Sequence, residues 1–164
     1  MKKIPFTRRF AAAAAGAATV AMVGAVVPAA PANAAAVYWT FQNRQTGKCL
    51  TAGSTDVVWA ASCNGSSSQQ WDWIASNFSG WQLLRSRSTG LCLRTDAQTT
   101  KNATWQSACD RNATGELFFY YADLQELTTA NEYYLAMDPG SSGGVYTTSY
   151  FGDGNYAYWY GTHT

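Results

Sequence analysis

The stretch at residues 59–73, WAASCNGSSSQQWDW, decides the fold because the chain repeats it. Residues 105–119 read WQSACDRNATGELFF and residues 146–160 read YTTSYFGDGNYAYWY, so an aromatic residue opens each copy and bulky residues close it. We interpret residues 71–73, 117–119 and 158–160 as one element that occurs three times. Such self-similarity at a fixed period is the sequence signature of a repeat architecture.

A second motif recurs upstream of the first. It reads TGKCLTA at residues 46–52, TGLCLRT at 89–95 and NEYYLAM at 131–137. Three units of roughly 40 residues therefore fill the chain from about Trp39 onward. One such unit cannot bury its apolar face alone, whereas three units around an axis can. We expect an all-β fold, a β-trefoil, as one domain at residues 35–164, with repeats at about 39–81, 82–120 and 121–164.

The local pattern favours strands throughout this part of the chain. Short runs such as VVWAAS, WQLLRS and YYLAM are separated by clusters of Gly, Ser, Asn and Asp. Residues 121–130, YADLQELTTA, are a weak helical candidate. A linear solenoid would need distinct capping repeats, for which no residues are left over. A sandwich of twelve strands with irregular topology stays open as the alternative.

The first 34 residues read as a secretory signal peptide. A basic start with Lys2, Lys3, Arg8 and Arg9 precedes an apolar run at residues 11–27, and Ala-Asn-Ala at residues 32–34 is a small-x-small cleavage site. Prolines at positions 28 and 31 interrupt the apolar run, which speaks against a membrane anchor. We expect cleavage after Ala34 and secretion. TRRF at residues 7–10 resembles a twin-arginine signal with its Phe one place early, so the export route stays open.

The charge balance after cleavage excludes several partners. Four of the 11 Lys and Arg residues lie in the signal peptide, which leaves seven against ten Asp and Glu. Nucleic-acid binding needs a basic face, and from Tyr121 onward the chain has five acids and neither Lys nor Arg. No further apolar stretch predicts a membrane contact. A zinc site is not expected, because CxxC is absent and His163 is the only histidine. We expect a monomer without a cofactor.

Four cysteines in an exported chain predict two disulfides, with three possible pairings. The first and second repeats each hold two cysteines. The third repeat has Tyr134 and Tyr150 at both equivalent positions. Loss of both together indicates that the two cysteines of one repeat pair with each other, since a single remaining thiol would be reactive. The predicted disulfides are Cys49–Cys63 and Cys92–Cys109.

The pattern G-x-C-L … C-N-G-x-x-x-Q-x-W resembles the ricin-B-type (R-type) lectin β-trefoil family. The first repeat carries it as Gly47-Lys48-Cys49-Leu50, Cys63-Asn64-Gly65 and Gln69-Gln70-Trp71. At the Gln and Trp positions, the second repeat has Gly115 and Leu117, and the third has Tyr156 and Tyr158. The resemblance implies carbohydrate binding in shallow pockets, one possible in each repeat. It also implies that Trp71 belongs to the core and that Gln69 holds a turn.

The resemblance selects the candidate sugar-binding residues. A sugar stacks its C–H face on an aromatic ring and offers its hydroxyls to acids and amides. An aromatic residue lies four positions before the second cysteine position in every repeat: Trp59, Trp105 and Tyr146. The family's acid directly after Cys-Leu is replaced by Thr51, Arg94 and Ala136.

Two further residue types complete the candidate sites. The family's Asn after the second cysteine is kept only as Asn64, which is followed by Gly65 and also reads as a turn signal. Asp96 and Asp138 lie two positions beyond the expected acid, and residues i and i+2 of a strand point to the same side. Either carboxylate would therefore reach a pocket from a shifted position.

These residues predict a secreted lectin-like module for extracellular or cell-wall polysaccharide. The alternative is a trefoil without sugar binding that contacts an extracellular protein as an inhibitor, adhesin or envelope component. An enzyme is not expected, because no serine has a plausible histidine base when His163 is one residue from the end.

Overall fold

Twelve antiparallel strands and three short 3-10 helices make up the part of the chain that the structure, a computed structural model, describes: residues 37–140 and 142–164. Residues 35–164 form one compact unit. The predicted signal peptide, residues 1–34, lies outside the described residues and stays a prediction. No helix in the described ranges is both long and apolar enough to cross a membrane.

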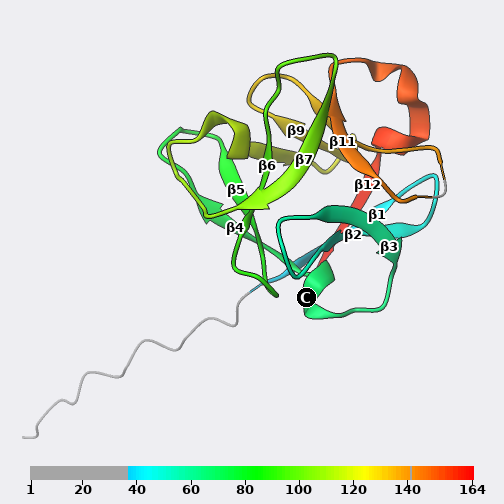
Figure 1. The fold of residues 1–164 in the computed structure, drawn as a ribbon, viewed down its shortest axis with the longest axis horizontal. Coiled ribbons are helices and arrows are strands. Elements are labelled where there is room, and N and C mark those ends of the chain that lie inside the picture. The colour runs from blue at the N-terminus through cyan, green and yellow to red at the C-terminus, as the bar shows by residue number, and fades with distance from the viewer. Residues whose placement is uncertain (1–36, 141) are drawn as a thin grey trace, which may run out of the picture. The chain divides into compact units, whose positions relative to one another are not determined.

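Each repeat contributes four strands and one 3-10 helix (Figure 1). The first repeat contains β1 (Trp39–Asn43), β2 (Lys48–Ala52), β3 (Val58–Ser62), η1 (Ser67–Gln69) and β4 (Trp71–Ala75). The second contains β5 (Gln82–Ser86), β6 (Cys92–Thr95), β7 (Lys101–Ser107), η2 (Thr114–Glu116) and β8 (Phe118–Tyr121). The third contains β9 (Glu126–Thr129), β10 (Tyr134–Met137), β11 (Val145–Thr148), η3 (Phe151–Ala157) and β12 (Trp159–His163). This threefold arrangement is the predicted all-β trefoil.

The barrel is closed by pairing between the repeats. The last strand, β12, pairs with β1 over five residues from Trp39↔His163 to Asn43↔Trp159, and Figure 1 shows the two strands side by side. Neighbouring repeats are likewise joined where β4 pairs with β5 and β8 pairs with β9. Within the first repeat β1 also pairs with β4, and within the second repeat β5 pairs with β8. The barrel therefore needs all three repeats, as the sequence pattern predicts for units that cannot bury their apolar faces alone.

Three aromatic side chains occupy equivalent positions in the core: Trp71, Phe118 and Trp159, each 0 % exposed. The indole Nε1 of Trp71 donates to the Leu50 carbonyl at 3.0 Å, and that of Trp159 donates to the Leu135 carbonyl at 2.9 Å. The prediction that Trp71 is a core residue is confirmed. Its equivalents, however, are not the predicted Leu117 and Tyr158.

The predicted register of the second and third repeats was wrong by one residue. Six positions separate Cys63 from Gln69, whereas seven separate Cys109 from Glu116, so the second repeat holds one additional residue in this loop. The Gln-x-Trp positions of the first repeat therefore correspond to Glu116 and Phe118, and to Ala157 and Trp159 in the third. Gly115 and Tyr156 fall one place too early.

The predicted helix at residues 121–130 was also wrong. The segment contains the last residue of β8, a turn and the strand β9, in which Leu127 is fully buried and pairs with Tyr120 of β8. Its apolar residues fit strand alternation as well as a helical period, and the tertiary pairing decides between the two.

Both predicted disulfides, Cys49–Cys63 and Cys92–Cys109, are confirmed. They close loops with sequence separations of 14 and 17. In the third repeat Tyr134 replaces the first cysteine and packs against the buried cluster of Ala136, Tyr146 and Ala157. In the third repeat, packing of the Tyr134 side chain thus takes the role that the disulfide has in the other two repeats.

Removal of the first disulfide should destabilise the domain markedly. For the double variant Cys49→Ala/Cys63→Ala we expect a loss of about 3 kcal/mol in the free energy of unfolding, because the cross-link restricts the unfolded chain. Urea unfolding followed by tryptophan fluorescence measures this loss. A double variant as stable as the parent protein would contradict the prediction, and peptide mapping without reduction checks the pairing directly.

Candidate functional site

The candidate aromatic residues of the three repeats occupy one equivalent position. Each lies directly opposite, on the adjacent antiparallel strand, the residue that follows Cys-Leu or its counterpart. The pairs are Trp59 with Thr51, Trp105 with Arg94 and Tyr146 with Ala136. Directly opposed residues of an antiparallel pair have neighbouring side chains on the same face. The structure therefore brings these predicted residues together within each repeat, although their surroundings differ.

In the first repeat the hydroxyl and amide candidates serve the fold. Thr51 is buried, and its Oγ1 donates to the Cys49 carbonyl at 2.8 Å and accepts from Gln69 Nε2 at 3.2 Å. The Oδ1 of Asn64 accepts from the backbone N–H of Ser66 at 3.0 Å, the hydrogen bond of an Asx turn. Both groups are thus engaged in local structure.

Gln69 holds this loop as expected. Its Oε1 accepts from the backbone N–H of Asn64 at 2.8 Å, and its Nε2 donates to the Ser62 carbonyl at 2.9 Å. Trp59, which is half-buried, packs on the backbone of Gly53, where an added Cβ would lie 2.8 Å from the indole ring. The first repeat thus keeps a partly accessible ring whose expected polar partners are engaged elsewhere.

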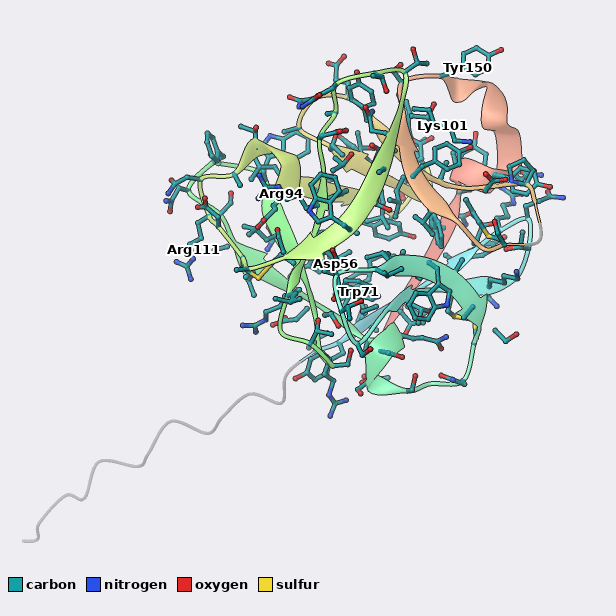
Figure 2. All side chains as sticks on the ribbon, viewed as in Figure 1. Asp56, Trp71, Arg94, Lys101, Arg111 and Tyr150 are labelled. Carbon is teal, nitrogen blue, oxygen red and sulfur yellow. A yellow bond between two sulfur atoms is a disulfide. The ribbon has the colours of Figure 1, made fainter. Side chains whose placement is uncertain are left out.

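In the third repeat a lysine covers the aromatic candidate. Tyr146 is 5 % exposed, and the Nζ of Lys101 lies 3.7 Å from the centre of its ring. The same Nζ lies 3.7 Å from Oδ2 of Asp138, and Oδ1 of Asp138 accepts from the backbone N–H of Gly140 at 2.8 Å. Lys101 belongs to β7 of the second repeat, which pairs with β11 (Figure 2). The third repeat therefore brings Tyr146 and Asp138 together, but Lys101 contacts both of them in the place where a sugar would bind.

The second repeat forms an open pocket at the equivalent place, with a volume of about 360 Å³. The half-buried Trp105 and the exposed Asp96 both line it, so the structure brings these two predicted residues together. Its complete lining is Arg94, Thr95, Asp96, Gln98, Trp105, Thr114 and Gly115. An aromatic ring, a carboxylate, an amide and a hydroxyl thus converge on one concave surface, which is the chemistry that a sugar requires.

Arg94 introduces a positive charge where the family has an acid. Its Nη1 lies 3.4 Å from Oε1 of Glu116, which is fully buried, while the arginine side chain is 38 % exposed (Figure 2). Glu116 also accepts from Ser107 Oγ at 2.6 Å through Oε1 and from the Asp110 backbone N–H at 2.9 Å through Oε2. A buried anion therefore fixes the guanidinium at the edge of the pocket.

Gly115 sets the distance between the two sides of the pocket. A Cβ added at this position would lie 2.2 Å from the Thr95 carbonyl oxygen, so only glycine lets η2 pack this closely on β6. Sequence reasoning missed the contributions of Gln98 and Thr114. No motif marks them: Gln98 lies in the loop between β6 and β7, and Thr114 is the first residue of η2.

Among the described residues, no three or more His, Cys, Asp or Glu side chains are grouped so that they could hold a metal ion.

Residues 37–144 match the family of ricin-type β-trefoil lectin domains, which is more than half of the chain. The chain belongs to this family. A comparison with curated protein sequences finds no match for this ricin-type domain.

Solved structures share its fold. The designed threefold-symmetric protein ThreeFoil is 21 % identical, with a TM-score of 0.65 over 76 % of this chain and 97 % of ThreeFoil. SeviL, solved with asialo-GM1 saccharide bound, is 13 % identical, with a TM-score of 0.61 over 77 % of this chain and 97 % of SeviL. A Clostridium perfringens endo-β-galactosidase that releases GlcNAcα1-4Gal is 15 % identical, with a TM-score of 0.64 over 79 % of this chain. The ricin-type domain covers 33 % of that enzyme, and at such identities the likeness shows the fold alone.

Proposed function

We propose that this protein is a secreted lectin that binds extracellular or cell-wall polysaccharide through the pocket of its second repeat. The observation that carries the proposal is the convergence of Trp105, Asp96, Gln98 and Arg94 on one pocket. A sugar stacked on the Trp105 ring would offer hydroxyl protons to Asp96 and accept hydrogen bonds from the Arg94 guanidinium.

Four further observations support this function. The ricin-type lectin domain is a carbohydrate-binding module, and SeviL, of the same fold, was solved with a bound saccharide. The signal-peptide pattern at residues 1–34 and the two disulfides both fit an oxidising compartment outside the cytosol. We expect binding without catalysis.

The Trp105→Ala variant tests this pocket. In a screen of immobilised glycans and polysaccharides, we expect at least one ligand whose affinity falls by about tenfold or more in the variant, because a central stacking side chain is lost. Trp59→Ala is the matched control, since Trp59 occupies the same position in the first repeat and should leave this affinity unchanged.

The structure also gives a specific reason to keep the alternative of protein contact. In two of the three repeats a candidate residue is engaged in the protein's own contacts: Thr51 with Gln69 in the first repeat and Tyr146 with Lys101 in the third. If the folded protein binds no glycan in the screen, the lectin proposal fails and a role through protein–protein contact replaces it.

A further inference from the structure

A second pocket lies on strands β8, β9 and β10, away from the pocket of the second repeat. Its volume is about 410 Å³, within the roughly 300–1,000 Å³ of small-molecule sites. Its lining is Tyr121, Leu124, Glu126, Thr128, Glu132 and Tyr134. It shares no lining residue with the Trp105 pocket, and none of its residues was among the candidate sugar-binding residues predicted from the sequence.

Strand register places the pocket residues on one face of the sheet. Glu126 and Thr128 alternate along β9, with the fully buried Leu127 between them pointing to the core. Glu126 pairs across to Tyr121 of β8, and Thr128 pairs across to Tyr134 of β10. On this face β9 thus carries an acid and a hydroxyl, each directly opposite a tyrosine of a neighbouring strand.

Glu126 is a buried acid without a cationic partner. The residue is 5 % exposed, and in the described ranges neither Lys nor Arg forms an ion pair with it. Burial raises the pKa of the Glu126 carboxyl. The pKa of Tyr134 is raised as well, first by burial and then by the negative charges of Glu126 and Glu132. An unpaired carboxylate in such a place is unfavourable for the free protein.

Thr128 provides a second, independent sign of a ligand. The residue is 8 % exposed, and its Oγ1 has no hydrogen-bond partner among the described residues. A buried hydroxyl without a partner is uncommon in a folded protein, because it has lost its hydrogen bonds to water without replacement. Since Thr128 lines the pocket, a ligand there would supply that partner.

We propose that this pocket binds a protonated amino sugar. An ammonium group is attracted to aromatic rings and donates charge-assisted hydrogen bonds to carboxylates, which Tyr121, Tyr134, Glu126 and Glu132 supply together. The sugar ring adds an apolar C–H face for the phenols and a hydroxyl for Thr128. The preference for a sugar as the carrier of the amine rests on the proposed lectin function, while the site itself is independent of the Trp105 pocket.

The test uses oligomers of glucosamine and of N-acetylglucosamine of equal length, titrated calorimetrically into the full chain at neutral pH. We expect the glucosamine oligomer to bind at least about tenfold more tightly, because acetylation removes the positively charged ammonium group from which the Glu126 carboxylate would accept a hydrogen bond. Equal affinity for the two oligomers would overturn the proposal. Tighter binding of a lysine-rich peptide than of the glucosamine oligomer would overturn the sugar as carrier.

Variants separate this site from the proposed lectin pocket. Glu126→Gln and Thr128→Val should each weaken binding of the glucosamine oligomer, by about tenfold or more for Glu126→Gln. Asp123→Asn removes the same charge from the exposed turn before β9 without lining the pocket, and should leave the affinity unchanged. Loss of binding in Trp105→Ala but not in Glu126→Gln would overturn the proposal and leave the lectin function standing.

The unfolding temperature of Glu126→Gln distinguishes loss of a binding group from loss of folding, because we expect the variant to be more stable than the parent. Because burial raises the pKa of Glu126 in the folded protein, the folded state disfavours the ionised acid at neutral pH. The variant should therefore unfold at a higher temperature than the parent at pH 7. Below the ordinary pKa of a glutamate both states are protonated and the difference should disappear. A variant that is less stable at pH 7 would show that the carboxylate already has a favourable internal partner, which contradicts the proposal.

Discussion

In a variant in which alanine replaces Trp71, we expect the free energy of unfolding to fall by about 3–5 kcal/mol. Trp71 is 0 % exposed, and its indole donates a hydrogen bond to the Leu50 carbonyl. Truncation removes a large buried apolar surface, leaves a cavity where β4 meets β1, and leaves that carbonyl without its donor. The loss is a large part of the 5–15 kcal/mol that stabilises a typical domain.

Urea unfolding measures this effect through the midpoint at a constant slope. Trp71→Phe is the matched control, because phenylalanine occupies the equivalent position in the second repeat as Phe118 and is fully buried there. We expect the phenylalanine variant to retain most of the stability, since only part of the ring and one hydrogen bond are lost. An alanine variant that unfolds like the parent would show that the barrel does not depend on its three central aromatic residues.

The sequence predicts the fold because the fold is built from a repeated pattern. Three copies of one motif, a cysteine pair that is present in two copies and lost as a pair in the third, and a Trp in the best preserved copy all indicate the same closed barrel, and the structure agrees. The register error in the second and third repeats has a local cause. An additional residue between Cys109 and Glu116 shifts the match by one, and Leu117-Phe118 offers two apolar residues for one core position.

The candidate site was harder to predict, because the accessibility of each pocket depends on contacts between repeats and on residues whose charge differs from that of the family, such as Arg94 in place of an acid. Lys101 of the second repeat lies on Tyr146 of the third, and no motif within one repeat reports a side chain that arrives from its neighbour. Asp96 was identified through strand alternation, which survives changes of residue type. The pocket at Glu126 did have a signal, since the chain has no Lys or Arg from Tyr121 onward, and acids there have few cations to pair with.

For Glu116→Ala we expect a loss of about 3–5 kcal/mol in the free energy of unfolding, because a buried anion with three donors disappears. The Glu116 carboxylate accepts from Ser107 and from the Asp110 backbone and pairs with Arg94, so truncation leaves the part-buried Asp110 N–H without this partner and frees the guanidinium. Glycan binding in the second repeat should weaken together with stability, since Arg94 would lose its fixed position at the pocket.

Glu116→Gln separates the charge of this side chain from its shape. The amide keeps an oxygen for the Asp110 N–H, as Gln69 does for the Asn64 N–H at the equivalent place in the first repeat. It removes the negative charge that holds Arg94. We therefore expect this variant to lose much less stability than Glu116→Ala in urea unfolding, yet to bind the glycan of the second repeat more weakly than the parent. Equal stability losses in the two variants would mean that the ion pair, and not the loop hydrogen bonds, stabilises this repeat. Unchanged glycan affinity in Glu116→Gln would mean that Arg94 needs no fixed anion to serve the pocket.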